Sequence, residues 1–432
     1  MRNAIVLVAL LSACASSRTA NDAEVDAAAD AGPADHGPVV SLAVGSGHAC
    51  AARADGTVDC WGSNAFGALG DGSEVSRSTA AEVPGVDDAL EVGAGLSSTC
   101  IRHRDLTVSC WGLLPNGGSM PTTVSSGRLR GIGDAVALSV NAFNACVVRR
   151  SGRVSCWGSN TAGQLGDGLL FHGTASMDWS AEPVDVLGIV DATHVVVGVE
   201  HACALDARGR TFCWGGGRQG ALGVDPSTLT GCPETCSARP VAALEAPLAP
   251  LMIAAGLRHT CAVGSDFFPR CWGASTRGLL GGGTLAGDPA CTDTIPCTVT
   301  PVRVDLADTV QLSASVSNHC ARRRDGAVAC WGLASTGLLG ADPSGFPSCE
   351  LVGSRDTCSP MPVTIPTVVD AIDVRVGGSA ACAVREGGTR VVCWGSDGEG
   401  VLGDGIPAHG DVCSQGEALA SCSLSPVAVS LP

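Results

Sequence analysis

The sequence predicts an all-β fold, a seven-bladed propeller of four-stranded blades. The triplet Cys-Trp-Gly occurs seven times, and a matching Cys precedes each triplet. The 58 Gly and 23 Pro leave few windows in which a helix of useful length can form. A repeat of this size indicates one structural unit per copy. The repeated tryptophans are Trp61, Trp111, Trp157, Trp214, Trp272, Trp331 and Trp394.

Each unit contains a β-hairpin between its two cysteines. A turn signal such as Asp55-Gly56 or Ser151-Gly152 lies near the middle, and apolar or β-branched residues flank it. A central turn places the two cysteines opposite each other, at a separation that a disulfide can bridge. The predicted hairpin disulfides join Cys50 with Cys60, Cys100 with Cys110, Cys146 with Cys156, Cys203 with Cys213, Cys261 with Cys271, Cys320 with Cys330, and Cys382 with Cys393.

Adjacent Cys and Trp residues, such as Cys60 and Trp61, point to opposite faces of their strand. Because both faces then carry apolar side chains, neighbouring units must cover both faces, as blades of a propeller do.

Two further strands complete each unit. A run such as residues 135–140 precedes the first Cys, and a Pro-Val strand start such as Pro183-Val184 follows the triplet, which gives four strands in about 56 residues. The first unit begins at Pro38 without an upstream Pro-Val strand, and the sequence ends on one. We therefore expect residues 426–431 to complete the first blade and close the ring.

The recurring pattern G-x-x-H-x-C-A, D-G-x-V-x-C-W-G, G-x-L-G-D-G closely resembles the repeat of the regulator of chromosome condensation family, over residues 38–432. The resemblance implies a seven-bladed propeller that presents one face to another protein, as an exchange factor, inhibitor or scaffold does. The second repeat lacks G-x-L-G-D-G, and the His is not constant, so a site that needs it in every blade is excluded. The His position holds His48, His201 and His259, but Ser98, Asn144, Asn318 and Ala380 elsewhere.

Eight other cysteines form close pairs in repeats four to seven. With the fourteen hairpin cysteines and Cys14 they account for all 23. Zinc needs convergent ligands, and these pairs lie in different blades, so we expect eleven disulfides and neither a metal nor a cofactor. The close pairs join Cys232 with Cys236, Cys291 with Cys297, Cys349 with Cys358, and Cys413 with Cys422.

The N-terminus is predicted to be an export signal. Arg2 precedes an apolar run over residues 4–11, which is far shorter than the roughly 20 residues that span a bilayer as a helix. Residues 11–14, Leu-Ser-Ala-Cys, resemble a bacterial lipobox, which implies a signal peptide at 1–13 and lipid on Cys14. An ordinary signal cut near Ala13 or Ala15 is the alternative.

Residues 14–37 are predicted to be a disordered tether. Residues 15–37 carry five acids, one Arg and a single large apolar residue, Val25, too little to bury. In the lipoproteins that the lipobox resembles, the absence of Asp after the lipidated Cys implies the outer membrane. We therefore expect the lipid alone to hold the protein in the cell envelope, on its periplasmic or surface face.

Composition and motifs argue against several classes of function. The 42 acids exceed the 26 basic residues, all Arg, for a net charge of −16, so a nucleic acid is not an expected partner. The sequence holds no nucleophile elbow, no HExxH and no P-loop Lys. Asp71, Asp167 and Asp404 are interpreted as turn caps rather than calcium ligands. The Arg at 149–150 and 322–324 form a solvated rim or, alternatively, a patch for an acidic partner.

The candidate binding residues are Phe171, His172 and Trp179, in an insertion at residues 169–182 that either packs under its loop or meets a partner. The favoured function is a monomeric, lipid-anchored envelope propeller that binds a protein or an envelope polymer through rim loops. The alternatives are an inhibitor of an envelope enzyme and an envelope hydrolase. Two inward carboxylates about 5 to 10 Å apart at the central opening favour the hydrolase, and an apolar or Arg-lined rim favours binding.

Overall fold

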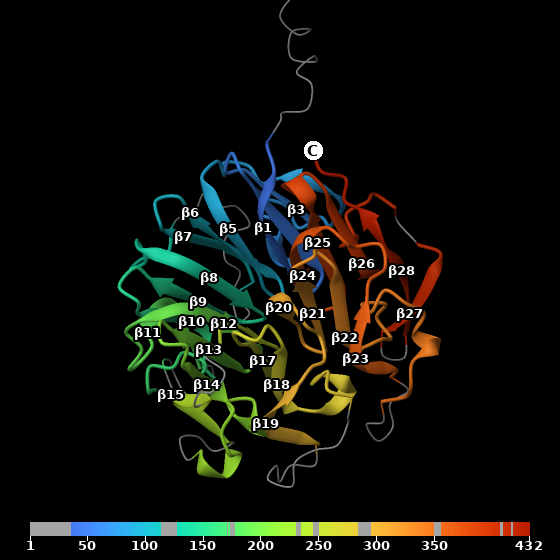
Figure 1. Ribbon diagram of the computed structural model, residues 1–432. Coiled ribbons are helices and arrows are strands. Elements are labelled where there is room, and N and C mark those ends of the chain that lie inside the picture. The colour runs from blue at the N-terminus through green and yellow to red at the C-terminus, as the bar shows by residue number, and fades with distance from the viewer. Residues whose placement is uncertain are drawn as a thin grey trace, which may run out of the picture. The chain divides into compact units, whose positions relative to one another are not determined.

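Antiparallel sheets arranged in a ring make up the described part of this protein, seen here in a computed structural model (Figure 1). His36–Pro432 form one compact unit. None of the described helices is long and apolar enough to cross a bilayer. The signal peptide, Cys14 and most of the tether lie outside the described residues, which are 36–113, 128–170, 172, 178–229, 235–244, 250–283, 295–349, 356–406, 409–415 and 418–432.

The first four blades follow one another along the chain. Blade 1 consists of β1 (Val39–Val44), β2 (His48–Arg53), β3 (Val58–Gly62) and β4 (Arg77–Glu82). Blade 2 consists of β5 (Ala89–Ala94), β6 (Ser98–His103) and β7 (Val108–Gly112). Blade 3 consists of β8 (Ala135–Asn141), β9 (Asn144–Arg149), β10 (Val154–Ser159) and β11 (Trp179–Asp185). Blade 4 consists of β12 (Ala192–Val197), β13 (His201–Asp206), β14 (Thr211–Gly216) and β15 (Cys236–Leu244).

The last three blades continue the pattern. Blade 5 consists of β16 (Met252–Ala255), β17 (His259–Val263), β18 (Pro269–Ala274) and β19 (Cys297–Arg303). Blade 6 consists of β20 (Thr309–Ala314), β21 (Asn318–Arg323), β22 (Val328–Leu333) and β23 (Cys358–Thr364). Blade 7 consists of β24 (Ala371–Val376), β25 (Ala380–Arg385), β26 (Val391–Ser396), β27 (Asp411–Gln415) and β28 (Ala418–Ala428). Short 3₁₀ turns lie at Ala65–Gly67, Arg218–Gly220, Pro226–Thr228, Thr276–Gly278, Pro343–Gly345 and Glu386–Gly388.

The predicted fold class is confirmed: the blades are antiparallel sheets in a ring, and the first strand of each lies nearest the centre (Figure 1). Blade 2 has three described strands and, in the place of a fourth, a bridge between Ser109 and Arg128. Blade 7 has an extra hairpin strand, β27, beyond its outer strand.

The C-terminal strand was assigned to the wrong blade. β28 pairs with β26 of blade 7, with Cys393 opposite Val427, and blade 1 has its own outer strand, β4. The reason is that β4 starts at Arg77 without the Pro-Val signal that marks the other outer strands, so its sequence does not resemble theirs. The C-terminus still contributes to closure, because Val429 packs into the cluster shared by blades 7 and 1.

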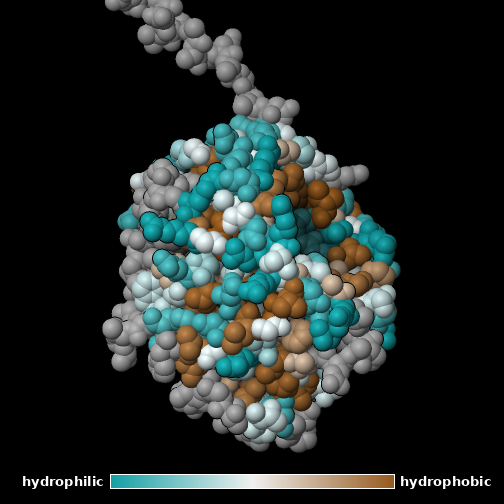
Figure 2. Space-filling view, turned by 90° about the vertical axis from the view of Figure 1, so that its left-hand side faces the viewer, coloured by the Kyte–Doolittle hydropathy of each residue, from teal (hydrophilic) through white to brown (hydrophobic). Residues whose placement is uncertain are grey.

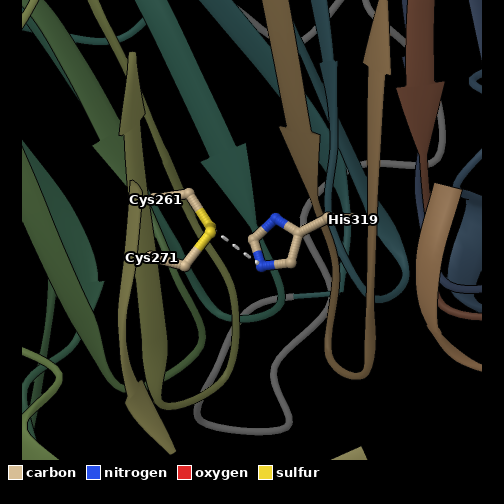
Figure 3. Close-up of side chains that lie close together, drawn as sticks. All are labelled: Cys261, Cys271 and His319. Atoms are coloured by element: carbon tan, nitrogen blue, oxygen red, sulfur yellow. Dashed lines mark hydrogen bonds between the residues drawn. A yellow bond between two sulfur atoms is a disulfide. The ribbon is translucent and has the colours of Figure 1, made fainter. Parts of the chain in front are cut away.

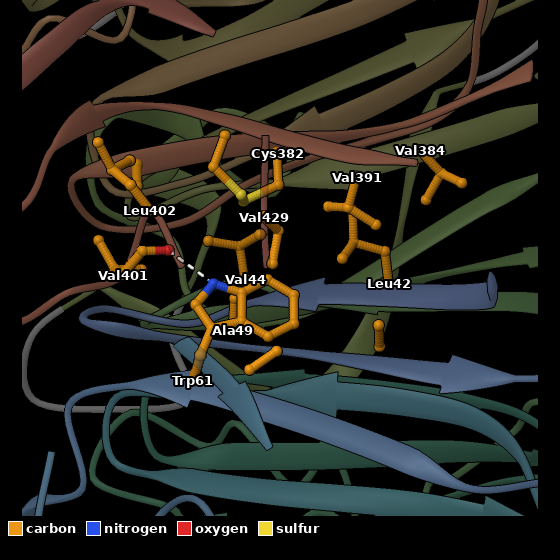
Figure 4. Close-up of a cluster of buried hydrophobic side chains, with 14 of the residues drawn as sticks. Leu42, Val44, Ala49, Trp61, Cys382, Val384, Val391, Val401, Leu402 and Val429 are labelled. Atoms are coloured by element: carbon orange, nitrogen blue, oxygen red, sulfur yellow. Dashed lines mark hydrogen bonds between the residues drawn. A yellow bond between two sulfur atoms is a disulfide. The ribbon is translucent and has the colours of Figure 1, made fainter. Parts of the chain in front are cut away.

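The ring closes through the same contacts that join neighbouring blades elsewhere. Trp61 of blade 1 donates from Nε1 to the carbonyl of Val401 in blade 7, at 2.8 Å, inside an apolar cluster that includes Leu42 and Val429 (Figure 4). Gly403 has φ +72°, and a Cβ there would lie 2.7 Å from the indole of Trp61, which explains the second Gly of G-x-L-G-D-G. Equivalent indole bonds run from Trp111 to Ala68, Trp214 to Gln164, Trp272 to Ala221, Trp331 to Leu279 and Trp394 to Leu338.

All seven predicted hairpin disulfides form. In each, the two cysteines face each other across the hairpin with Cα atoms 4.0 to 4.1 Å apart. The central turn therefore sets the register as expected from the sequence. The bonds join Cys50 to Cys60, Cys100 to Cys110, Cys146 to Cys156, Cys203 to Cys213, Cys261 to Cys271, Cys320 to Cys330, and Cys382 to Cys393.

The close pairs are described in part. Cys349 is bonded to Cys358, and Cys413 to Cys422, each with Cα atoms 5.8 Å apart. Cys236 and Cys297 are also disulfide-bonded. Their predicted partners, Cys232 and Cys291, lie outside the described residues. Nine of the eleven predicted pairs are thus confirmed within the described chain.

Candidate binding surface at the propeller axis

A cavity of about 240 Å³ runs into the centre of the ring and is lined by the inner strands of all seven blades. Its lining contains two charged residues, Glu91 and Arg375. Glu91 accepts from Nε of Arg102 at 2.8 Å and from the backbone N–H of Leu138 at 3.2 Å. Arg375 forms an ion pair with Asp373 at 3.1 Å. Among the lining residues there is therefore one carboxylate, and it is committed to an Arg.

The polar groups along the cavity join blades to each other. The hydroxyls of Ser41, Ser139 and Ser313 each accept a backbone N–H from the next inner strand, at 3.0 to 3.2 Å. Backbone bonds also link successive turns between first and second strands, and the bond from Gly378 to Gly45 at 3.0 Å continues them across the closure. These serines therefore act as structural acceptors that join neighbouring blades.

One end of the axis is surrounded by β-bulges. In six of the seven inner strands the register shifts after the first residue, and a single residue is left without a partner. A bulge turns the side chain of such a residue away from the sheet. We call these six residues the bulge collar: Val40, Leu90, Val136, Thr193, Val310 and Ile372.

Four members of the bulge collar are exposed apolar side chains. The exposed fractions are 53% for Val40, 38% for Leu90, 43% for Val136 and 47% for Ile372. Since the inner strand runs antiparallel to the second strand, the collar lies at the end of the ring where the hairpin turns lie, with Val39 opposite Arg53. Exposed apolar side chains in four consecutive blades, 7, 1, 2 and 3, form a surface that suits a protein partner.

Charged groups next to the bulge collar are mostly bonded within the fold. Arg149 donates to Asp134 at 2.8 Å, and Arg385 donates to Asp370 at 2.5 Å and holds the pKa of that carboxyl below its ordinary value. In the predicted Arg rim, Arg322 and Arg323 likewise donate to acceptors in blade 6, Gln311 and Ala307. Arg150 and Arg324 are exposed, and Arg324 lies 4.6 Å from the ring centre of Phe267.

The predicted binding residues lie elsewhere. Phe171 is outside the described residues, and His172 faces inward, with Nε2 3.0 Å from Oδ2 of Asp167. Trp179 is half-buried at the start of β11, the outermost strand of blade 3, opposite Ser159. The sequence reasoning missed the bulge collar. Its signal is an apolar residue at the second position of most inner strands. The first residue is buried, so strict alternation would expose the second residue, where a polar side chain is expected.

The outer side of the ring is mixed in character. Figure 2 views the side that lies to the left in Figure 1, over blades 2 to 4, where visible hydrophilic and hydrophobic residues alternate over short distances. The described residues visible there do not gather into one apolar patch.

The repeated His residues are structural. The hydroxyl of Thr99 donates to the carbonyl of Ala68, so Nε2–H of His48 donates to Thr99 at 2.9 Å. Burial lowers the pKa of His48 to about 4, and that of His201, which contacts Thr260 in the same way, to about 4.

Cys261, Cys271 and His319 have the side-chain types of a metal site but cannot form one. Nε2 of His319 lies 3.4 Å from Sγ of Cys261, and the two sulfurs form a disulfide (Figure 3). A disulfide provides no thiolate ligand. Burial also lowers the pKa of His319 to about 3, so the ring packs as a neutral group.

The predicted turn-capping role of the DG aspartates is present. Oδ1 of Asp71, Asp167 and Asp404 accepts a backbone N–H two residues later, at 2.9 to 3.1 Å. Burial raises the pKa of the Asp71 carboxyl, but the bonds from Ser73 and the bond from Arg77, at 2.7 Å, outweigh it and lower the pKa.

Comparison with known proteins agrees with the blade structure. The model of the regulator of chromosome condensation (RCC1) repeat matches residues 39–68, 135–164 and 151–205, in blades 1, 3 and 4. These segments of the chain are similar to the RCC1 repeat. The matched segments include the Cys-Trp-Gly triplets of blades 1 and 3.

Relatives with RCC1-like folds differ widely in sequence. The ultraviolet-B receptor UVR8 of Arabidopsis thaliana is 29% identical over 212 residues, which is 49% of this chain and 42% of the receptor. Prp20p of Saccharomyces cerevisiae has a TM-score of 0.65 at 17% identity, covering 91% of this chain and 88% of Prp20p. Human WBSCR16 has a TM-score of 0.62 at 18% identity, covering 88% and 95%. These structures share the fold.

Proposed function

We propose that this chain is a lipid-anchored propeller of the cell envelope that binds a protein through its bulge collar. The observation that carries the proposal is the ring of bulges, which turns four large apolar side chains outward around one end of the axis. Burial of apolar surface is the main driving force of most protein association. The collar needs no movement of the blades to be accessible.

The cavity at the axis supports binding over hydrolysis. A glycosidase places two carboxyl groups about 5 to 10 Å apart. The described lining has Glu91 alone, bonded to Arg102, and its other charge is Arg375. An inhibitor of an envelope enzyme would be one form of the same binding function.

Two solved relatives support a protein partner. Yeast RCC1 (Prp20) has been solved bound to Kap60, and Prp20p has been studied for its binding to Gsp1p and histones. A protein partner is therefore the favoured class here, ahead of an envelope polymer.

The disulfides support export, because paired cysteines persist in oxidising compartments. The anchor is proposed on Cys14, and the tether would hold the propeller away from the membrane. A labelled fatty acid should be incorporated into the wild type and not into Cys14→Ala, which should leave the membrane fraction. Membrane retention of unlabelled Cys14→Ala would contradict the anchor.

Site-specific photo-crosslinking in intact cells tests the binding function. A photoreactive amino acid at Leu90 or Ile372 should give a discrete adduct. The same probe at Val75 or Met361, which are exposed at 69% and 59% away from the axis, is the matched control. Equal adducts from all four positions, or none from the collar, would reject the collar as the contact surface.

A further inference from the structure

Blade 7 brings two carboxylates and one imidazole together in a buried cluster. Asp397 follows β26, Asp404 lies in the next turn, and His409 precedes β27. Their ligand atoms all lie within 4.8 Å of one another. The side chains are 1%, 8% and 8% exposed. Two acids at this depth need a compensating cation, because an unpaired buried charge is costly.

We propose that Asp397, Asp404 and His409 bind one Zn²⁺ ion. Nε2 of His409 lies 3.4 Å from Oδ2 of Asp397 and 3.4 Å from Oδ2 of Asp404. Two ligands bonded at about 2.1 Å to a tetrahedral zinc ion are about 3.4 Å apart. Hydrogen bonds between nitrogen and oxygen are shorter, at about 2.7 to 3.2 Å. The spacing is therefore that of ligands around a metal.

The free atoms of the cluster point to the same ligand. Within the described chain, neither Nε2 of His409 nor Oδ2 of Asp404 has a hydrogen-bond partner, and both are buried. The other oxygens are in use, because Oδ1 of Asp397 accepts from Leu402 at 3.1 Å and Oδ1 of Asp404 accepts from Ile406 at 3.0 Å. Each carboxylate is thus held by one oxygen while the other faces the cluster, as in metal sites with an ordered outer shell.

The same loop in two other blades supplies the comparison. Blade 1 has Asn64 where blade 7 has Asp397, and Arg77 donates to Oδ2 of Asp71 at 2.7 Å. Blade 3 has Asn160, and the loop His there, His172, is 3.0 Å from Asp167. In each of those blades, one Asp of the loop is paired with one basic side chain. In blade 7 the basic side chain, His409, lies 3.4 Å from each of two acids.

The chemistry of the three ligands selects zinc among divalent cations. Calcium and magnesium take oxygen ligands, whereas imidazole favours zinc and similar transition metals. A water molecule would complete the tetrahedron. The site would hold the loop that meets blade 1, since Gly405 donates to Ser78 at 2.8 Å and Trp61 donates to Val401.

Zinc binding by the full exported chain, first stripped with a chelator, tests the proposal by calorimetry and metal analysis. We expect one equivalent for the wild type and at least a tenfold loss of affinity for Asp397→Asn. This variant should fold, because Asn64 and Asn160 make the same bond to the backbone, at 2.8 and 3.0 Å. Its melting temperature in chelator, equal to that of the wild type, confirms folding.

The matched control is Asp167→Asn, which alters the blade 3 counterpart of Asp404 and should leave the single equivalent intact. His409→Gln should lose it. Zinc should raise the melting temperature of the wild type and the control, and leave Asp397→Asn unchanged. A wild type that binds no zinc would overturn the site. So would an Asp397→Asn variant that binds as tightly, or a loss of binding in Asp167→Asn, which would place the ion elsewhere.

Discussion

The interior of the blades and the ends of the ring are built by different rules. Between blades, the same groups recur at each seam: a buried tryptophan, a hairpin disulfide and, in several blades, a neutral histidine. In the loops and outermost strands, the residues differ from blade to blade, as Phe66, Trp179 and Met361 illustrate.

This difference indicates that residues between blades serve stability, whereas exposed residues at the ends serve function. A buried group that contacts two blades is constrained from both sides, so its loss costs packing and hydrogen bonds together. An exposed bulge residue such as Ile372 contacts little and is free to vary with the partner. The predictions below test this division, beginning with the interior.

The largest effect is expected from acid. His48, His201, His259 and His319 are buried, and burial lowers the pKa of each below its ordinary value of 6.5, to about 4 for His48. The unfolded chain takes up these protons near pH 6.5 and the folded chain does not, so stability is full above pH 6.5 and falls toward pH 4. Between about pH 7 and 5 we expect the free energy of unfolding to fall by about 2 kcal/mol for each histidine.

Urea denaturation at both pH values measures this loss. His48→Asn should reduce the difference by about one quarter, and Asn is a suitable replacement because Asn144 and Asn318 occupy the same repeat position. His194→Asn, which replaces an exposed histidine of an inner strand, is the control and should change nothing. An unaltered pH dependence in His48→Asn would show that the buried histidines are not its source.

The next effect separates two tryptophans. Trp214→Ala removes a fully buried indole and its 2.8 Å bond to Gln164, and should cost about 3 to 5 kcal/mol. Trp179→Ala removes a half-buried one from an outer strand and should cost much less, about 1 kcal/mol. Thermal and chemical denaturation compare the two. Equal losses would mean that the blade 3 edge is as constrained as the seam.

Removal of a disulfide should also cost more stability between blades than at the outer edge of a blade, although the difference should be smaller than for the tryptophans. The pairs Cys50–Cys60 and Cys413–Cys422 close loops of similar length, so chain entropy gives each about 3 kcal/mol. The first also packs in the cluster between blades 1 and 2, so its double Ala variant should lose more stability. Denaturation of the two double variants under the same conditions measures the margin, and a greater loss at Cys413–Cys422 would contradict it.

The part of the fold that was predictable follows from the interior. The residues equivalent to Trp61 and to the pair Cys50–Cys60 recur because every seam needs them. The repeat therefore revealed the number of blades, the hairpins and the disulfide pairing. The one misplaced strand, at the C-terminus, reflects the unusual sequence of β4, which hides the outer strand of blade 1. Pattern alone identifies a strand only where its sequence resembles its counterparts.

The sites were less predictable because they depend on positions in space. The bulge that exposes Val40 is a local change of register, and an apolar residue at that position does not by itself show that the register shifts. At the zinc cluster the sequence contains one clue, since Asp397 stands where repeats one and three have Asn, but His409 joins it only through the path of the loop. The function expected for residues 171, 172 and 179 is still a prediction, and the inward position of His172 favours packing there.

The smallest effect on stability is expected at the bulge collar, where the effect on binding should be greatest. Val40→Ser and Ile372→Ser alter side chains that are about half exposed, so each should change the free energy of unfolding by about 0.5 kcal/mol or less. Against the partner captured by crosslinking, each should weaken binding by about 1 to 2 kcal/mol, as central apolar contacts do. Val75→Ser and Met361→Ser, which are more exposed but lie away from the axis, should change neither quantity. Collar variants that lost stability but kept their affinity would show that the bulge residues belong to the packed interior. The division between a stabilising interior and a binding surface would then not hold at this end of the axis.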